Sequence, residues 1–454
     1  MPLTVTQQLL GLDRFPVMGW CSIPEELTRP DVFAAIRDCG INLIMTTGAG
    51  GGATGPTGTA VPIRRQLDLA AEHGLKAIVC DRRFNPVKNP ANDDWKRAVD
   101  TALAEYRAHP AAAGFYVFDE PVVSDPSSRC GCEDVGPMVA YLTQQAPDKL
   151  AYVNALGFGS RGANSFPEYL DRYLSLINPQ FLSTDCYPLT SLPDENIFPG
   201  YVDDDAGLRI VELDAYYREA YWEGWEIQAR AARTWKKPLW GFVMAIPHTH
   251  SRWFYGPVTE GTIRLEAFTA LAYGAEAIQY FALPTHTTNS YYEDGILDAD
   301  GRPSLRYELF RRVNRDLAIL GPLVAELQMQ DVYYRGYIPS GGKRFRFGRY
   351  AGDESHRPLA HLDNEDNLLL SFMDGKDGAR YLFVVNNHPA RRTRVRLSLE
   401  TGWTFREVIK HTGAFTDNLS GTHLANFEPG DARLFRMIHD GESILERALG
   451  EASS

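Results

Sequence analysis

The segment His109-Pro-Ala-Ala-Ala-Gly-Phe-Tyr-Val-Phe-Asp-Glu-Pro121 contains a short apolar strand of the kind that recurs along most of this chain. Its short apolar run, residues 114–119, is typical of a buried strand. An amphipathic helical pattern over residues 93–108 comes before it and stops ahead of Pro110. The strand ends in Asp119 and Glu120, and Pro121 removes a ladder donor at that point. The segment therefore predicts a helix, then a buried strand that ends in two carboxylates.

The same alternation of apolar strand and amphipathic helix continues on both sides of this segment. Helices are expected at residues 30–39, 62–73, 93–108, 166–177, 210–235, 259–273 and 305–327, several of them beginning on Pro or ending before Gly. Eight strands with helices between them over roughly 310 residues predict an α/β fold, a (β/α)₈ TIM barrel. A doubly wound open sheet is the alternative, and the count of eight disfavours it. The expected strands are Phe15–Cys21, Asn42–Thr47, Lys76–Asp81, Gly114–Asp119, Leu150–Ala155, Phe181–Asp185, Leu239–Ile246 and Ala277–Leu283.

The pattern changes after about residue 328. Short alternating runs bounded by Gly, Asp, Asn and Pro now follow one another, which is typical of a small antiparallel β-sandwich. They lie at residues 332–338, 368–373, 381–386, 392–399, 405–409 and 432–437. We therefore expect a barrel domain over residues 1–328, a β-sandwich over residues 329–440 and a tail over residues 441–454.

Composition restricts the partners and the compartment. Apolar residues make up 44% and charged residues 23% of the 454 residues, as in ordinary globular proteins. The net charge of −12 argues against nucleic acid and anionic membranes, because both require clustered Lys and Arg. The N-terminal residues lack the pattern of a signal peptide, and six cysteines in so long a chain favour a reducing compartment, so we expect a cytoplasmic protein. Barrels with an appended sandwich often self-associate, so a homo-oligomer is an expected state.

Carboxylates stand at the ends of three expected strands. In a TIM barrel the active site lies at the C-terminal ends of the strands, where Asp81, Asp119, Glu120 and Asp185 are expected. Hydrolysis of a glycosidic bond needs two carboxyl groups, one that protonates the leaving oxygen and one that attacks or activates water. Adjacent strand residues point to opposite faces, so Asp119 and Glu120 can both face the barrel mouth only where the strand is ending. Structural roles, such as caps or ion pairs with Arg82 or Arg83, are the alternative.

Three segments resemble the clan-A-like (β/α)₈ glycoside hydrolases with a C-terminal β-sandwich. Residues 109–121 look like their fourth strand, which carries Asn-Glu-Pro with the Glu as acid/base; here Asp119 replaces the Asn. Residues 274–281 are similar to their eighth strand, and residues 428–435 look like the last strands of their sandwich. The resemblance implies a glycosidase in which Glu120 is the acid/base, acting on an oligo- or polysaccharide without an organic cofactor.

The chain departs from these enzymes at strand seven. They carry the nucleophilic Glu at the end of that strand, whereas residues 239–246 contain no carboxylate. We expect Asp185 to be the second catalytic carboxylate, because it shares one face of strand six with Ser183 and stands at its end. Asp81 is held in reserve. The expected substrate-binding residues, which offer hydroxyl partners or flat apolar surfaces, are Asp119, Asp81, Arg82, Asn154, Tyr187, His248, His250, Trp253 and Trp20.

Other interpretations of the same residues remain open. His248 and His250 share a face of an extended segment and could bind a metal with His286 and Asp185, which would give a metal-dependent hydrolase. A barrel that binds carbohydrate without cleaving it is a further alternative. Gly50-Gly-Gly52-Ala-Thr-Gly55 matches a dinucleotide-binding pattern, but prolines interrupt the helix that such a site needs, so a loop over the barrel mouth is expected. Cys130-Gly-Cys132 is expected in a polar loop.

Overall fold

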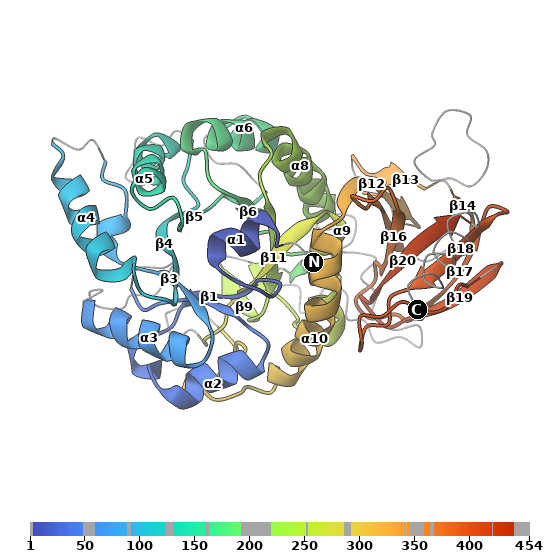
Figure 1. Cartoon of the computed structure of the whole chain (residues 1–454), viewed down its shortest axis with the longest axis horizontal. Helices are drawn as coiled ribbons and strands as arrows, with labels where there is room; N and C mark the ends of the chain where they lie inside the picture. Colours follow the sequence, from blue (N-terminus) through green and yellow to red (C-terminus); the bar gives the residue numbers. More distant parts are fainter. Residues whose placement is uncertain are drawn as a thin grey trace, which may run out of the picture.

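A computed structural model shows the arrangement of the chain (Figure 1). It describes residues 3–48, 60–88, 92–123, 130–158, 163–191, 219–250, 253–285, 292–336, 338–339, 341–345, 358–363, 367–419 and 421–439. The helix expected over residues 210–235 is therefore described only from residue 219, and the expected tail over residues 441–454 lies outside the described residues.

Eight parallel strands form the first domain, in the order β5-β4-β3-β2-β1-β11-β8-β6. The two outer strands meet through a bridge between Ala155 and Thr184, where the Ala155 N–H donates to the carbonyl of Ser183 at 3.0 Å. The sheet is therefore closed, and the (β/α)₈ barrel is confirmed over the doubly wound alternative. Its strands are β1 (Val17–Ser22), β2 (Leu43–Met45), β3 (Lys76–Val79), β4 (Ala112–Asp119), β5 (Leu150–Asn154), β6 (Leu182–Thr184), β8 (Leu239–Met244) and β11 (Ala275–Phe281).

Helices surround this barrel as a ring (Figure 1). Their ends follow from local sequence: α6 begins after Ser165, whose hydroxyl accepts from the Glu168 N–H, and Asn178 ends it in the left-handed region. The described helices of the ring are α2 (Pro30–Asp38), α3 (Ala60–Glu72), α4 (Asp94–Tyr106), α5 (Cys132–Gln145), α6 (Phe166–Ile177), α8 (Glu219–Trp235), α9 (Glu260–Ala272) and α10 (Tyr307–Ala325).

Two helices were not expected from the sequence. Helix α1 (Val5–Leu10) lies inside the ring of helices in Figure 1, at the N-terminal end of the barrel, and its Thr6 hydroxyl accepts from the buried Trp240 indole at 3.1 Å. Helix α5 begins at Cys132, in the segment expected to be a polar loop. The Asp134 carboxylate accepts from the Gly131 N–H at 2.9 Å and caps this helix, so Cys132 is a buried first-turn residue.

The C-terminal domain is a sandwich of two antiparallel-rich sheets. One has the order β13-β12-β15-β16-β20-β18 and the other β14-β17-β19, and their inner faces share one hydrophobic core. The sandwich is therefore confirmed. Its strands are β12 (Gln328–Arg335), β13 (Lys343–Arg344), β14 (Leu359–Asp363), β15 (Leu368–Asp374), β16 (Arg380–Asn386), β17 (Thr393–Leu399), β18 (Trp403–Glu407), β19 (Thr422–Phe427) and β20 (Ala432–His439).

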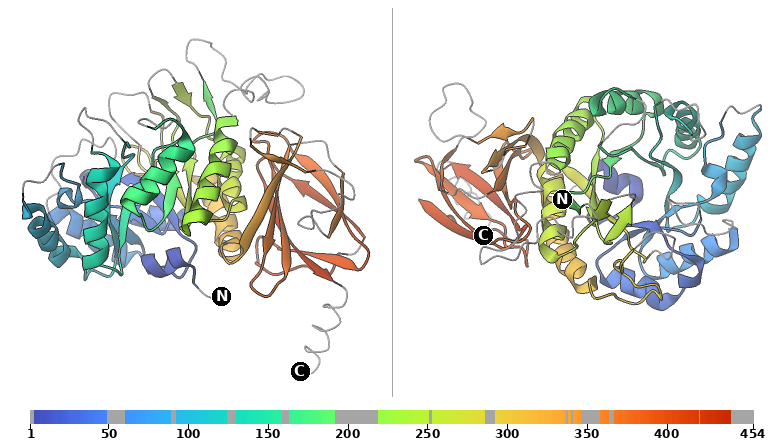
Figure 2. Two further views of the ribbon diagram at one scale, coloured as in Figure 1. Left: turned by 90° about the horizontal axis from the view of Figure 1, so that it is seen from above. Right: turned by 180° about the vertical axis from the view of Figure 1, so that it is seen from behind.

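The sandwich packs directly on the barrel helices α9 and α10 (Figure 2). The Ser371 hydroxyl of β15 donates to the carbonyl of Ala272 at the end of α9, at 2.6 Å. A Cβ at Gly261 would lie 1.9 Å from the Pro389 carbonyl oxygen, so only glycine allows this approach. Buried side chains of the six-stranded sheet belong to the same hydrophobic cluster as the barrel core. The expected boundary at residue 328 lies where α10 has ended and β12 begins.

Candidate active site

Three carboxylates gather where strands β4 and β6 end. Asp119 is the last residue of β4, Glu120 follows it, and Asp185 follows the last residue of β6. Asn154, the last residue of the intervening strand β5, lies between them. Its side-chain Nδ2 is 3.2 Å from Asp119 Oδ1 and 3.4 Å from Asp185 Oδ1. The structure therefore brings together four of the residues that the sequence selected.

The backbone at Glu120 explains how two adjacent acids serve one site. Glu120 has φ = 53°, in the left-handed region that a residue with a side chain rarely adopts, at a cost of roughly 1–3 kcal/mol. Its N–H donates to the Asn154 carbonyl at 3.0 Å. This conformation ends the alternation of the strand, so the Asp119 side chain bonds to Asn154 while the Glu120 side chain bonds to Asp185. A left-handed residue at this position could not be foreseen from Asp-Glu-Pro.

The carboxyl groups of Glu120 and Asp185 are hydrogen-bonded to each other. A hydrogen bond between two carboxyls requires a proton on one of them, because an ionised carboxylate only accepts. Burial raises the pKa of Asp185 above its ordinary value, and hydrogen bonds from Glu120, its own backbone and Asn154 offset part of this rise. The carboxyl groups of Glu120 and Asp185 therefore face each other in a buried site, where burial favours the protonated form of Asp185.

Asp81 takes part in a different arrangement, away from the other carboxylates. It caps the short 3₁₀ helix η2 (Arg82–Phe84), and only 3% of the residue is exposed. Its carboxylate accepts from the Arg83 guanidinium at 2.6 and 3.0 Å and from the Tyr106 hydroxyl at 3.0 Å. Arg82 is exposed on the outside of the same turn. Asp81 thus holds the β3–α4 connection, and neither residue has a described contact with Asp119, Glu120 or Asp185.

An aromatic group lies at the mouth on the side of β8 and β11. The His248 ring is stacked between Tyr255 and Tyr292, at centroid distances of 4.9 and 5.1 Å. Its Nδ1 is 2.8 Å from the Ile246 carbonyl, so Nδ1 carries a proton, because a carbonyl oxygen only accepts. Tyr187 meets Tyr255 edge to face at 6.2 Å, and buried Trp20 contacts Phe242 and Phe281 deeper in the barrel.

Strand β8 is followed by a hairpin of β9 (His248–His250) and β10 (Trp253–Tyr255), which pairs with β7 (Thr190–Ser191). The backbones of His250 and Trp253 lie in this hairpin, and their side chains lie outside what the structure describes. His286 and the segment 50–55 also fall outside the described residues. Within the described ranges, no group of three His, Cys, Asp or Glu side chains could hold a metal ion.

Two features of this end of the barrel were not predicted from the sequence. Tyr292 completes the stack around His248 from the segment after β11, which is far away in the chain. Glu266 of α9 is buried behind β8, and its Oε2 accepts from the Met244 N–H at 2.8 Å. Strand β6 stops opposite Gly241, so the end of β8 has no strand on that side, and Glu266 supplies the acceptor. A lone Glu within an otherwise apolar helix face was the available signal.

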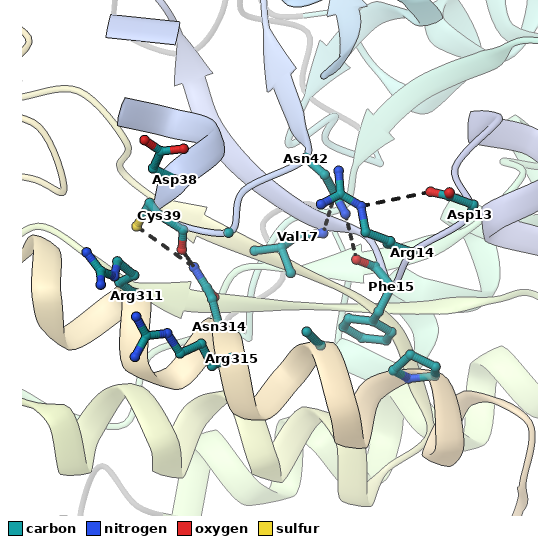
Figure 3. A pocket seen from close by; sticks show the side chains of 13 residues that line it. Asp13, Arg14, Phe15, Val17, Asp38, Cys39, Asn42, Arg311, Asn314 and Arg315 are labelled. Atoms are coloured by element: carbon teal, nitrogen blue, oxygen red, sulfur yellow. Dashed lines mark hydrogen bonds and ion pairs between the residues drawn. The ribbon is translucent and has the colours of Figure 1, made fainter. Parts of the chain in front are cut away.

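A separate cavity of about 640 Å³ lies at the opposite, N-terminal end of β1 (Figure 3). Arg14 and Arg311 at its rim are near the carboxylates of Asp13 and Glu308, respectively. The buried amide of Asn42 bonds to the backbone of Phe15 and Val17, and that of Asn314 to Cys39 and Tyr280. These amides tie the foot of β1 and the end of α2 to neighbouring elements, far from the carboxylates at the other end of the barrel.

Several solved structures of glycoside hydrolases are similar to this chain in fold, at low sequence identity. A β-galactosidase from the Antarctic haloarchaeon Halorubrum lacusprofundi matches with a TM-score of 0.50 and 13% identity over 92% of this chain and 98% of that one. A β-galactosidase from the psychrophilic Marinomonas ef1 matches with a TM-score of 0.49 and 13% identity over 70% of this chain and 63% of that one, so the match spans less than two thirds of its length. An α-amylase from Geobacillus thermoleovorans has a TM-score of 0.48 and 10% identity over 94% and 98% of the two chains.

No family model and no curated protein sequence matches this chain. The match to the Halorubrum structure, at 13% identity, shows a similarity of fold alone. None of the helices in the described part of the chain is long and apolar enough to cross a membrane.

Proposed function

We propose that the protein is a glycoside hydrolase that cleaves O-glycosidic bonds of an oligo- or polysaccharide. The observation that carries this proposal is the group of three carboxyls at the ends of β4 and β6, in which Asn154 Nδ2 faces Asp119 and Asp185 and Glu120 hydrogen-bonds to Asp185. Glu120 would protonate the leaving oxygen, and Asp185 would attack the anomeric carbon or stabilise its developing charge. Asn154 and Asp119 lie within the same hydrogen-bonded group.

The surroundings of the pair support a sugar as the substrate. A pyranose has hydroxyl groups at its rim and C–H bonds on its faces, so its site needs both hydrogen-bonding groups and apolar surfaces. The carboxylates supply the first at the ends of β4 and β6. The half-buried rings of Tyr255 and Tyr292, which stack on the two faces of His248, supply the second beside β8 and β11. The similarity in fold to the solved β-galactosidase of Halorubrum adds support.

The location and the assembly state of the protein belong to the same proposal. All six cysteines carry free thiols, which supports a cytoplasmic location. A homo-oligomer would be detected by light scattering of the purified protein.

The test is hydrolysis of a panel of aryl glycosides and oligosaccharides by the wild type, Glu120→Gln and Asp185→Asn. Both variants should lose at least about 10²-fold in kcat, the scale for removal of an acid or base group. Asp171→Asn, an exposed carboxylate on α6, is the matched control and should keep full activity. Sugar binding without cleavage would instead establish a carbohydrate-binding barrel, and activity lost only with a chelator would move the chemistry to the histidines.

A further inference from the structure

We propose that Ser183 and Asn154 are positioning residues: Ser183 orients the Asn154 amide, and Asn154 holds Asp119 and Asp185 on one NH₂ group. This inference rests on the proposed function for its catalytic consequence, but the geometry itself concerns only described residues of the chain. Asn154 thereby acquires a role different from the direct sugar contact that the sequence predicts for it.

The hydrogen bonds leave only one orientation for the amide. The Ser183 hydroxyl donates to Asn154 Oδ1 at 2.7 Å, and Asn154 Nδ2 faces Asp119 and Asp185 at 3.2 and 3.4 Å. Carboxylates only accept, whereas a hydroxyl can donate, so a flipped amide would place its oxygen against two carboxylate oxygens. Ser183 is fully buried and Asn154 is 1% exposed, so water cannot take over the contact with Oδ1.

The barrel topology brings these four residues into one row. Asp119 of β4 is in register with Asn154 of β5, and the bridge between Ala155 and Thr184 aligns β5 with β6. Ser183 and Asp185, two residues apart, share a face of the strand end. Gly157 allows the loop after β5 to close on Asp185, since a Cβ there would lie 2.1 Å from the Asp185 carbonyl oxygen.

One amide shared by two carboxylates favours their ionised forms. A donor facing an ionised carboxylate lowers its pKa, and the Asn154 amide does so for Asp185 against the rise caused by burial. Weakening the hydrogen bond from the Asn154 amide should therefore raise the pKa of Asp185, so that this carboxylate becomes protonated and inactive at a higher pH. Several titratable groups face Asp185 from the surrounding elements. They are Asp119 at the end of β4, Glu120 directly after it, Cys186 and Tyr187 next to Asp185 in the chain, Tyr169 on α6 and Tyr255 on β10.

The experiment compares Ser183→Ala and Asn154→Asp with a matched control on the same strand. Thr184→Val removes the neighbouring hydroxyl, which donates to Gln228 Oε1 at 3.1 Å, a buried hydrogen bond directed away from the carboxylates. Two quantities are measured: the pH profile of kcat/KM on the sugar that the wild type cleaves, and the carboxyl pKa values from ¹³C NMR with labelled Asp. The second needs no turnover.

Ser183→Ala should lower kcat roughly tenfold, the scale of one lost hydrogen bond. It should also move the acid limb of the pH profile to higher pH. Asn154→Asp, which replaces the donor with a third carboxyl, should move that limb by about one pH unit or more. Thr184→Val should leave both quantities at the wild-type values. Loss of kcat with unchanged limb and unchanged carboxyl pKa values in both site variants would overturn the inference, as would an equal shift in Thr184→Val. If the wild type cleaves no sugar, the proposed function fails, while the carboxyl titration still decides this inference.

Discussion

Asp81→Asn tests whether a carboxylate at a barrel strand end acts in stability or in catalysis. The carboxylate accepts four hydrogen bonds, from the Arg83 backbone N–H, from Nε and Nη2 of its side chain and from the Tyr106 hydroxyl. The side chain is 3% exposed and that of Arg83 27%, so the pair is largely shielded from water. Breaking a buried pair costs about 3–5 kcal/mol, and the remaining bond of Arg83 to Glu105 reduces this to about 3 kcal/mol.

Urea unfolding followed by fluorescence measures this loss, and kcat on the cleaved glycoside should stay within about twofold of the wild type. Burial raises the pKa of Asp81, but the Arg83 hydrogen bonds outweigh it and hold that pKa below its ordinary value. The stabilisation is therefore present above the unfolded-state pKa of about 4 and disappears as pH falls below it, so the two proteins should converge in acid. Glu105→Gln, at a more exposed partner, should cost no more than about 1 kcal/mol. Wild-type stability together with a large loss of kcat in Asp81→Asn would refute the structural role.

The remaining predictions concern other parts of the molecule. Burial raises the pKa of Glu266 well above its ordinary value, so the folded protein keeps a proton that the unfolded chain releases. The free energy of unfolding therefore falls as pH rises above about 4.3. Glu266→Gln should unfold at a higher urea concentration than the wild type, by a larger margin at pH 8 than at pH 5. His248→Leu should raise KM about tenfold with a smaller change in kcat, as measured by steady-state kinetics, because the ring lies in the aromatic stack and not in the carboxyl pair. Ser371→Ala should lower stability by about 1–2 kcal/mol while calorimetry still shows one transition, because the two domains share a core.

The sequence predicted the barrel strands well because each one is a short apolar run between stronger helix signals. It also placed Asp119, Glu120, Asn154 and Asp185 at neighbouring strand ends, since the C-terminal ends of parallel strands meet at one edge. The order of the strands around the barrel follows from the regular alternation of strand and helix along the chain. These predictions depend on periodicity, which is a local property.

What the sequence did not predict depends on departures from regular geometry or on distant segments. The turn after β3 is a 3₁₀ helix, so Arg83 and not Arg82 faces Asp81. Helix α5 contains Pro137 inside it, a residue that removes a helix hydrogen bond and argues against a helix, so the sequence did not predict this helix. The stack of His248 with Tyr292 joins residues from two different strand–helix connections, and no local pattern links them.

The end of β8 carries no carboxylate of its own, and other parts of the chain cap and follow this strand end. Glu266 caps it from the helix side through the Met244 N–H, and the chain then runs into the hairpin that stacks His248 between two tyrosines. The charged groups come instead from β4 and β6, where Asn154 and the left-handed backbone at Glu120 hold them together. In the proposed function, a sugar ring at this end of the barrel would meet hydrogen-bonding groups at the ends of β4 and β6 and apolar ring faces beside β8 and β11. A catalytic pair contained on one side of the barrel is therefore the arrangement that Glu120→Gln and Asp185→Asn test, and it requires no residue from strand seven to donate or accept a proton.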